Sequence, residues 1–229
     1  MQSFSQRNNM NTKQKDIIKR ILKSIFGLFI FSIGDYLTIV ANIGLTPWDS
    51  LTMGIANSIN ISFGTISVAS SIIIIIIDLL MNEKIGFGTV LDAIFVGTFV
   101  DFFIADFHIP YARNTFAGIT YLTIGLLIMA IGQVFYMSSG LSCGPRDTLL
   151  IAVGKRLPKI QIGHVDILMK VVLIGISLII KGPIGIGTLY AMVMMGFAMQ
   201  MVYKIFNFEP RDIKHESVIE TINSFVKHD

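Results

Sequence analysis

Six long apolar stretches, separated by short polar connections, organise the chain. They are Ile25–Ile43, Phe63–Leu80, Thr89–Phe103, Phe116–Met137, Ile162–Ile180 and Thr188–Phe206. Each approaches the ~20 residues that an α-helix needs to cross ~30 Å of hydrocarbon. Backbone groups in lipid must bond within their own segment, so even the β-branched run 72–77 is predicted to be helical. The pattern predicts an all-α, polytopic transmembrane helical bundle.

The composition supports this prediction. Apolar residues make up 53% of the 229 residues and charged residues only 14%, with a mean hydropathy of +0.70. A soluble domain of this length could not bury so much apolar surface. The basic residues border apolar segments, which is typical of topology signals, so we expect no nucleic-acid partner. Their distribution predicts a multi-pass membrane protein with both termini cytoplasmic.

The chain also contains an internal repeat. Pro-x-Asp at 47–49 recurs at 145–147, and Ile-Gly-x-Gly-Thr at 85–89 recurs at 184–188. Recurrence of such motifs in the same order and at nearly the same shift predicts two homologous units.

The chain is predicted to have three parts, the second of which contains both repeats. A basic cytoplasmic N-terminal segment, 1–24, precedes a membrane domain, 25–206, and a cytoplasmic C-terminal tail, 207–229, follows it. Within the membrane domain, the first repeat covers 25–105 and the second covers 116–206.

Each unit includes a short segment, Trp48–Ile59 or Arg146–Leu157, with too few residues to cross unaided. Both segments follow a break and begin with proline and then an aspartate, a signature of helix starts. We predict broken or re-entrant helices here. Each unit then has three spans, and the odd number makes the two repeats inverted. The alternative is that both short segments cross, which gives eight spans and parallel repeats.

The starts of these short helices are the predicted substrate-binding site. If they lie inside the membrane, their free N–H groups and dipoles favour an anionic group, and an arginine adds positive charge. The alternative is that the aspartates only cap helices at the surface. The predicted substrate-binding residues are Thr46, Trp48, Asp49, Arg146 and Asp147.

A second set of polar residues lies inside the spans, where a central charge costs roughly 2.5–3.5 kcal/mol. The repeat aligns Asp35 with Gln133 and Asp101 with Gln200, so the same two places are polar in both units. We interpret these four as coupling or pathway residues, with the aspartates as proton or cation carriers. The alternative is that they form hydrogen bonds between helices.

Other residues in the spans are interpreted as structural. Asp166 and Lys170 stand four apart on one helix and can neutralise each other. Four glycines are predicted to allow close helix packing: Gly34, Gly97, Gly132 and Gly196.

Signatures of catalysis are absent from the sequence. It has no nucleophile with an apparent base, no HExxH, no Walker loop and no G-x-S-x-G elbow. Cys143 is the only cysteine, and the histidines have no metal-ligand spacing. We therefore expect no catalytic residues, no metal site and no cofactor, and the chain is not predicted to be an enzyme.

Three motifs carry a resemblance to a known family. The Gly-Leu-Thr-Pro-Trp-Asp of 44–49, the Gly-Pro-Arg-Asp of 144–147 and the paired Gly-x-Gly-Thr at 86–89 and 185–188 resemble the YczE-like bacterial integral membrane proteins. The YitT group is a more distant look-alike. The resemblance covers about 25–206 and implies a bacterial plasma-membrane location, but it transfers no active-site residues.

These observations favour a secondary transporter of an unidentified small molecule. One alternative is a substrate-binding membrane subunit of a multicomponent transporter, and another is a non-transporting membrane scaffold or regulator. The expected partners are the lipid bilayer and a small-molecule ligand, with a homo-oligomer left open.

Overall fold

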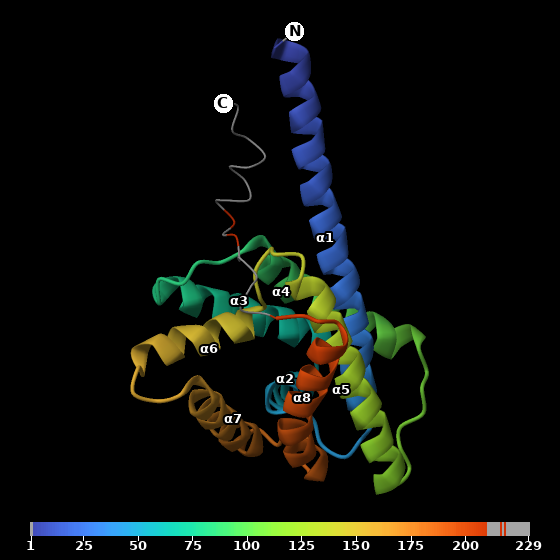
Figure 1. Cartoon of the computed structure of the whole chain (residues 1–229). Helices are drawn as coiled ribbons and strands as arrows, with labels where there is room; N and C mark the ends of the chain where they lie inside the picture. Colours follow the sequence, from blue (N-terminus) through green and yellow to red (C-terminus); the bar gives the residue numbers. More distant parts are fainter. Residues whose placement is uncertain (1, 210–215, 217, 219–229) are drawn as a thin grey trace.

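The computed structural model describes residues 2–209, 216 and 218, and within them it forms a bundle of eight helices (Figure 1). These are α1 Gln2–Val40, α2 Pro47–Ile59, α3 Phe63–Leu80, α4 Phe87–Asp106, α5 Thr115–Met137, α6 Pro145–Arg156, α7 Ile162–Ile179 and α8 Ile186–Ile205. The described residues contain no strand, so the predicted all-α fold is confirmed. Most of the predicted tail, 207–229, lies outside the described residues.

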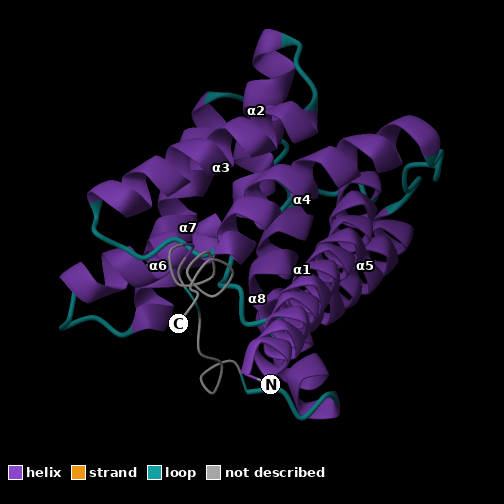
Figure 2. Cartoon of the chain, turned by 90° about the horizontal axis from the view of Figure 1, so that it is seen from above, coloured by secondary structure: helices purple, strands orange, loops and turns teal. Residues whose placement is uncertain are grey.

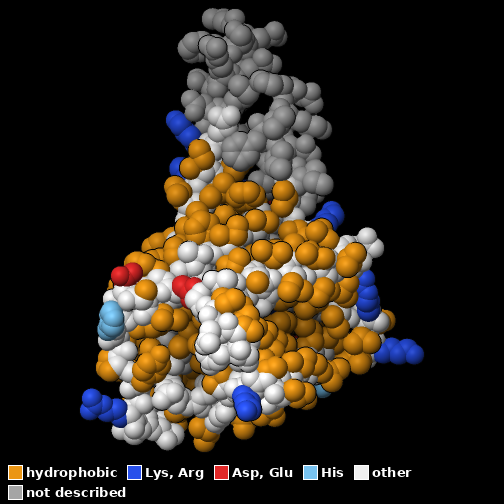
Figure 3. Space-filling view, turned by 180° about the vertical axis from the view of Figure 1, so that it is seen from behind, with side chains coloured by type: hydrophobic (Ala, Val, Ile, Leu, Met, Phe, Trp, Pro, Cys, Tyr) orange, Lys and Arg blue, Asp and Glu red, His pale blue; other side chains and the backbone are white. Residues whose placement is uncertain are grey.

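Five described helices are long and apolar enough to cross a membrane: α3, α4, α5, α7 and α8. They coincide with five of the six predicted spans. The sixth, Ile25–Ile43, corresponds to the C-terminal part of α1, which begins at Gln2. The segment predicted as 1–24 is thus, from residue 2, continuous with the first span, and α1 projects from the bundle (Figure 1). Apolar side chains cover most of the bundle face in Figure 3, as contact with lipid requires.

Two helices are much shorter than a span. α2 has 13 residues and α6 has 12, so at 1.5 Å per residue each extends about 20 Å or less. Both have proline in the first helical turn. α2 ends at Asn60, whose left-handed conformation (φ 53°) terminates the helix. The two predicted short helices are therefore present, each within one or two residues of its expected bounds.

α1 and α5 pack side by side and antiparallel through glycines (Figure 2). A Cβ added at Gly27 would lie 2.8 Å from the carbonyl oxygen of Gly132, and one at Gly34 would lie 2.5 Å from that of Gly125. Only hydrogen fits between backbones this close. The close packing predicted at Gly34 and Gly132 is confirmed.

Several other contacts come in pairs that the sequence repeat relates. α1 packs against α4 as α5 packs against α8, and α2 packs against α7 as α6 packs against α3. This exchange of partners between units is the pattern that a two-fold relation between them produces. The inversion of the two repeats across the membrane stays a prediction.

One contact breaks the correspondence between the units. α3 packs against α4, where a Cβ at Gly97 would lie 2.5 Å from the carbonyl oxygen of Gly64. The aligned residues of the second unit, Gly163 and Gly196, would meet no atom within 4 Å. The packing prediction is confirmed for Gly97 and wrong for Gly196, because α7 packs against α2 and α6 and not closely against α8.

Candidate functional site

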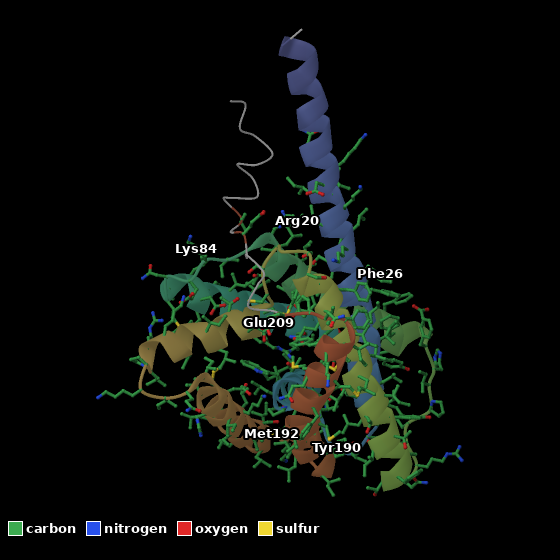
Figure 4. The ribbon with its side chains drawn as sticks, in the orientation of Figure 1. Arg20, Phe26, Lys84, Tyr190, Met192 and Glu209 are labelled. Carbon is green, nitrogen blue, oxygen red and sulfur yellow. The ribbon has the colours of Figure 1, made fainter. Side chains whose placement is uncertain are left out.

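A cavity of about 190 Å³ lies among the helices, and every one of the eight contributes to its wall. All five predicted substrate-binding residues line it, which brings the starts of α2 and α6 together. Met192 of α8, labelled in Figure 4, also lies in the wall. Its other apolar lining residues include Phe31, Val96, Met129, Met169, Met195 and Met199.

Asp49 is fixed at the start of α2 by local bonds. Thr46, the residue before the helix, accepts a hydrogen bond from the Asp49 backbone N–H at 3.4 Å, and its hydroxyl donates to the Asp49 carboxylate. Asp49 is only 1% exposed. Thr46 is therefore the capping residue of α2, and the Asp49 carboxylate, which the alternative interpretation treats as a surface cap, is held inside the protein.

Arg146, at the start of α6, pairs with Asp49 across the cavity. Its Nη1 lies 2.9 Å from Asp49 Oδ1, and its guanidinium carbon lies 5.4 Å from the centre of the Trp48 ring. The two short helices are therefore joined by an ion pair that is buried on the aspartate side. Because this charge is already matched, it no longer supports the predicted anion site.

Two further carboxylates face the cavity without a basic partner among the described residues. Asp147 accepts a hydrogen bond from the Tyr136 hydroxyl at 3.4 Å. Asp92 of α4 lies against the start of α6, where a Cβ added at Gly144 would come within 3.0 Å of its Oδ2. Among the described residues, neither carboxylate forms an ion pair with a basic side chain. The two carboxylates repel each other electrostatically.

The structure confirms the predicted pair between Asp166 and Lys170, with 2.6 Å between carboxylate and ammonium. Both residues line the cavity. The pair therefore stabilises α7 locally and also forms part of the cavity wall.

The four predicted coupling residues are placed differently. Gln133 lines the cavity, whereas Asp35 is 2% exposed and does not line it. Asp101 accepts from the Gly64 backbone N–H at 2.7 Å at the start of α3, and Gln200 is exposed. Of the four predicted coupling residues, only Gln133 is therefore part of the cavity wall.

Sequence reasoning did not select Asp92 or Tyr136 for the site. The repeat motifs at 85–89 and 184–188 are 99 residues apart, and the same shift aligns Asp92 with Ala191, which also lines the cavity. The third span of each unit therefore contributes the same aligned position to the cavity wall, but only the residue of the first unit is polar. Tyr136 had no signal in the sequence, because its role depends on the approach of α6 to the end of α5.

Known proteins resemble this chain over most of its length. An uncharacterized protein of Haemophilus influenzae is 29% identical over 188 residues, covering 82% of this chain and 84% of the relative. The uncharacterized membrane protein YczE of Bacillus subtilis is 26% identical over 190 residues, covering 82% and 86%. The uncharacterized protein YyaS of the same organism is 28% identical over 182 residues, covering 78% and 90%.

No solved structure matches the chain. The resemblance to YczE-like proteins is confirmed by these relatives, and an integral membrane protein is what the apolar helices and the named membrane relative together indicate. A family model matches residues 18–204, which include the apolar part of α1, both short helices and every residue that lines the cavity. The chain belongs to the family of unknown function DUF6198.

Proposed function

We propose that this protein is a secondary transporter that binds a small molecule in the central cavity. The observation that carries the proposal is the ion pair between Asp49 and Arg146, which joins the starts of two short helices at one cavity and links residues 97 positions apart. Broken helices that meet at a central site between two repeats are typical of secondary transporters. If Asp49 only capped a helix at the surface, it would not need to be buried or paired with an arginine of the other unit.

The arrangement of the two units supports the same proposal. α1 and α5 are the first long helices of the aligned units, and they run antiparallel, as inverted repeats require. α3 packs on α4, but α7 does not pack on α8 in the same way. Two related units that hold different internal packings suit alternating access, because an exchange of the two packings would move the opening from one side to the other.

The first test removes both aspartates at the starts of the short helices. Purified protein is first screened against a small-metabolite panel by thermal shift, and a compound that raises the melting temperature is then offered to proteoliposomes. We expect Asp49→Asn together with Asp147→Asn to lower the initial transport rate about tenfold or more, because the carboxylate at the start of each short helix is lost.

Asp106→Asn is the matched control, since Asp106 is exposed at the end of α4 and does not line the cavity. It should transport like the unchanged protein. Transport that survives in the double variant would refute the proposed site. A compound that binds but is not moved by the pure protein would favour the binding-subunit alternative.

We further propose that Asp35 couples transport to protons. It is 2% exposed, and one of its carboxyl oxygens has no hydrogen-bond partner. A buried carboxyl group without a partner is costly in its charged form, so a proton on Asp35 stabilises this arrangement. Movement of the surrounding helices that opens Asp35 to water would release that proton, which links transport to protons.

Asp35→Asn should therefore abolish substrate-driven proton flux but keep substrate counterflow, which needs no net proton movement, within about twofold. A pH-sensitive dye inside the vesicles measures the first and labelled substrate the second. Asp101→Asn is the control, because Asp101 caps α3, and it should keep both activities. Proton flux that persists in Asp35→Asn, or is lost in Asp101→Asn alone, would assign coupling elsewhere.

A further inference from the structure

We infer that the ligand of the central cavity is a small organic cation, an amine with an apolar body, whose ammonium group binds between Asp92 and Asp147. This ligand is positively charged, whereas the helix starts alone would suggest an anion. Its movement across the membrane rests on the proposed transport function, but its binding does not.

The charges in the cavity wall carry the first step. Four carboxylates and two basic groups line the cavity: Asp49, Asp92, Asp147, Asp166, Arg146 and Lys170. Both bases are paired, Arg146 with Asp49 at 2.9 Å and Lys170 with Asp166 at 2.6 Å. Two carboxylates are left over, which in a site of low dielectric is costly unless a cation or protons join them.

The second step, which does not depend on the charges, is a buried hydrogen-bond acceptor without a partner in the same wall. Gln133 lines the cavity and is only 5% exposed, yet its amide oxygen has no hydrogen-bond partner. An unpartnered buried acceptor costs about 1–3 kcal/mol. Asp147 accepts only the 3.4 Å bond from Tyr136, and the Gln133 amide oxygen accepts none, so a ligand that fits brings N–H groups as well as positive charge, as an ammonium group does.

The third step is the apolar part of the wall. Phe31, Trp48 and five methionines surround the charged groups. Flexible thioether side chains fit apolar bodies of varied shape, and the face of Trp48 already receives one cation, the Arg146 guanidinium. A cavity of about 190 Å³ limits the body to roughly the size of one aromatic ring.

Three probes that share one phenyl ring separate the ligand classes by charge: benzylammonium, benzyl alcohol and benzoate. Their dissociation constants are measured by calorimetry on the full chain in detergent at pH 7. We expect benzylammonium to bind about tenfold or more tightly than the other two. Tighter binding of benzoate, or no binding of benzylammonium at millimolar concentration, would overturn the inference.

Variants locate the ammonium group. Asp92→Asn and Asp147→Asn should each weaken benzylammonium binding about tenfold or more, whereas Asp147→Glu should restore most of it because the charge is kept. Asp106→Asn, on the same helix as Asp92 but exposed, should leave the affinity unchanged within about twofold. Unfolding midpoints of all variants distinguish a lost contact from a lost fold, and unweakened binding in a folded Asp92→Asn, Asp147→Asn double variant would overturn the site.

Flux of labelled benzylammonium into proteoliposomes, with empty liposomes as the blank for passive entry of the neutral amine, separates this inference from the proposed function. Benzylammonium that binds, with no flux above that blank, would refute transport and leave the ligand class standing. Transport of a carboxylate by a protein that does not bind benzylammonium would refute the ligand class and leave transport standing.

Discussion

Arg146→Ala is expected to lower the free energy of unfolding by about 3 kcal/mol or more, because it leaves a buried carboxylate without its counter-charge. The Asp49 side chain is 2% exposed and its carboxylate lies 2.9 Å from the guanidinium. Trp48 is the only tryptophan in the chain and lies beside Arg146. Its fluorescence therefore follows unfolding of the purified protein by SDS at the site itself.

A double-mutant cycle separates the interaction energy between Asp49 and Arg146 from the contribution of each residue alone. Asp49→Asn combined with Arg146→Ala removes both charges, so its cost should be smaller than the sum of the two single changes. Arg113→Ala is the matched control, because Arg113 is exposed outside the cavity, and it should change stability by about 0.5 kcal/mol or less. An Arg146→Ala protein as stable as the control would show that the pair is not buried in the folded state.

The helices could be predicted from the sequence because their causes are local. Continuous apolar length marks the spans, and Thr46 with Pro47 marks the start of α2 two residues before Asp49. The bounds of the short helices followed from such signals almost to the residue. The length of α1 could not be predicted in this way, because its N-terminal half is polar and carries no span signal.

The repeat predicted part of the site and failed where similar residues have different roles. At 49/147 both residues reach the cavity, but at 101/200 the first caps α3 through Gly64 and the second is exposed. Aligned polarity therefore does not establish a shared function. Asp92 was overlooked for the reverse reason, since its aligned residue is apolar although both line the cavity.

The net charge of the site could not be read from the sequence either. The motif at 144–147 contains an arginine and a helix start, which together favour an anion. Only the folded chain shows that this arginine is matched by Asp49 and that Asp92, from a distant span, approaches the same helix start. The sign of the cavity is set by which charges are paired, and pairing depends on how the two units pack.

Gly34→Ala should be among the most destabilising single-methyl changes in the chain, with a loss of about 3 kcal/mol. The added Cβ would lie 2.5 Å from the carbonyl oxygen of Gly125 and 2.6 Å from the backbone N of Met129. Backbone atoms cannot move aside as a flexible side chain can, so α1 and α5 must separate. The shift of the SDS unfolding midpoint measures the loss.

Gly175→Ala supplies the matched control, because Gly175 lies within α7, is exposed and would meet no atom within 4 Å. Alanine favours helix over glycine by about 1 kcal/mol, so this variant should be unchanged or slightly more stable. Gly132, which the repeat aligns with Gly34, would place its Cβ 2.7 Å from the Gly27 carbonyl oxygen. Gly132→Ala should therefore cost about as much as Gly34→Ala. A two-fold relation between α1 and α5 would give both glycines the same surroundings, so a large loss at only one of the two would contradict such a relation.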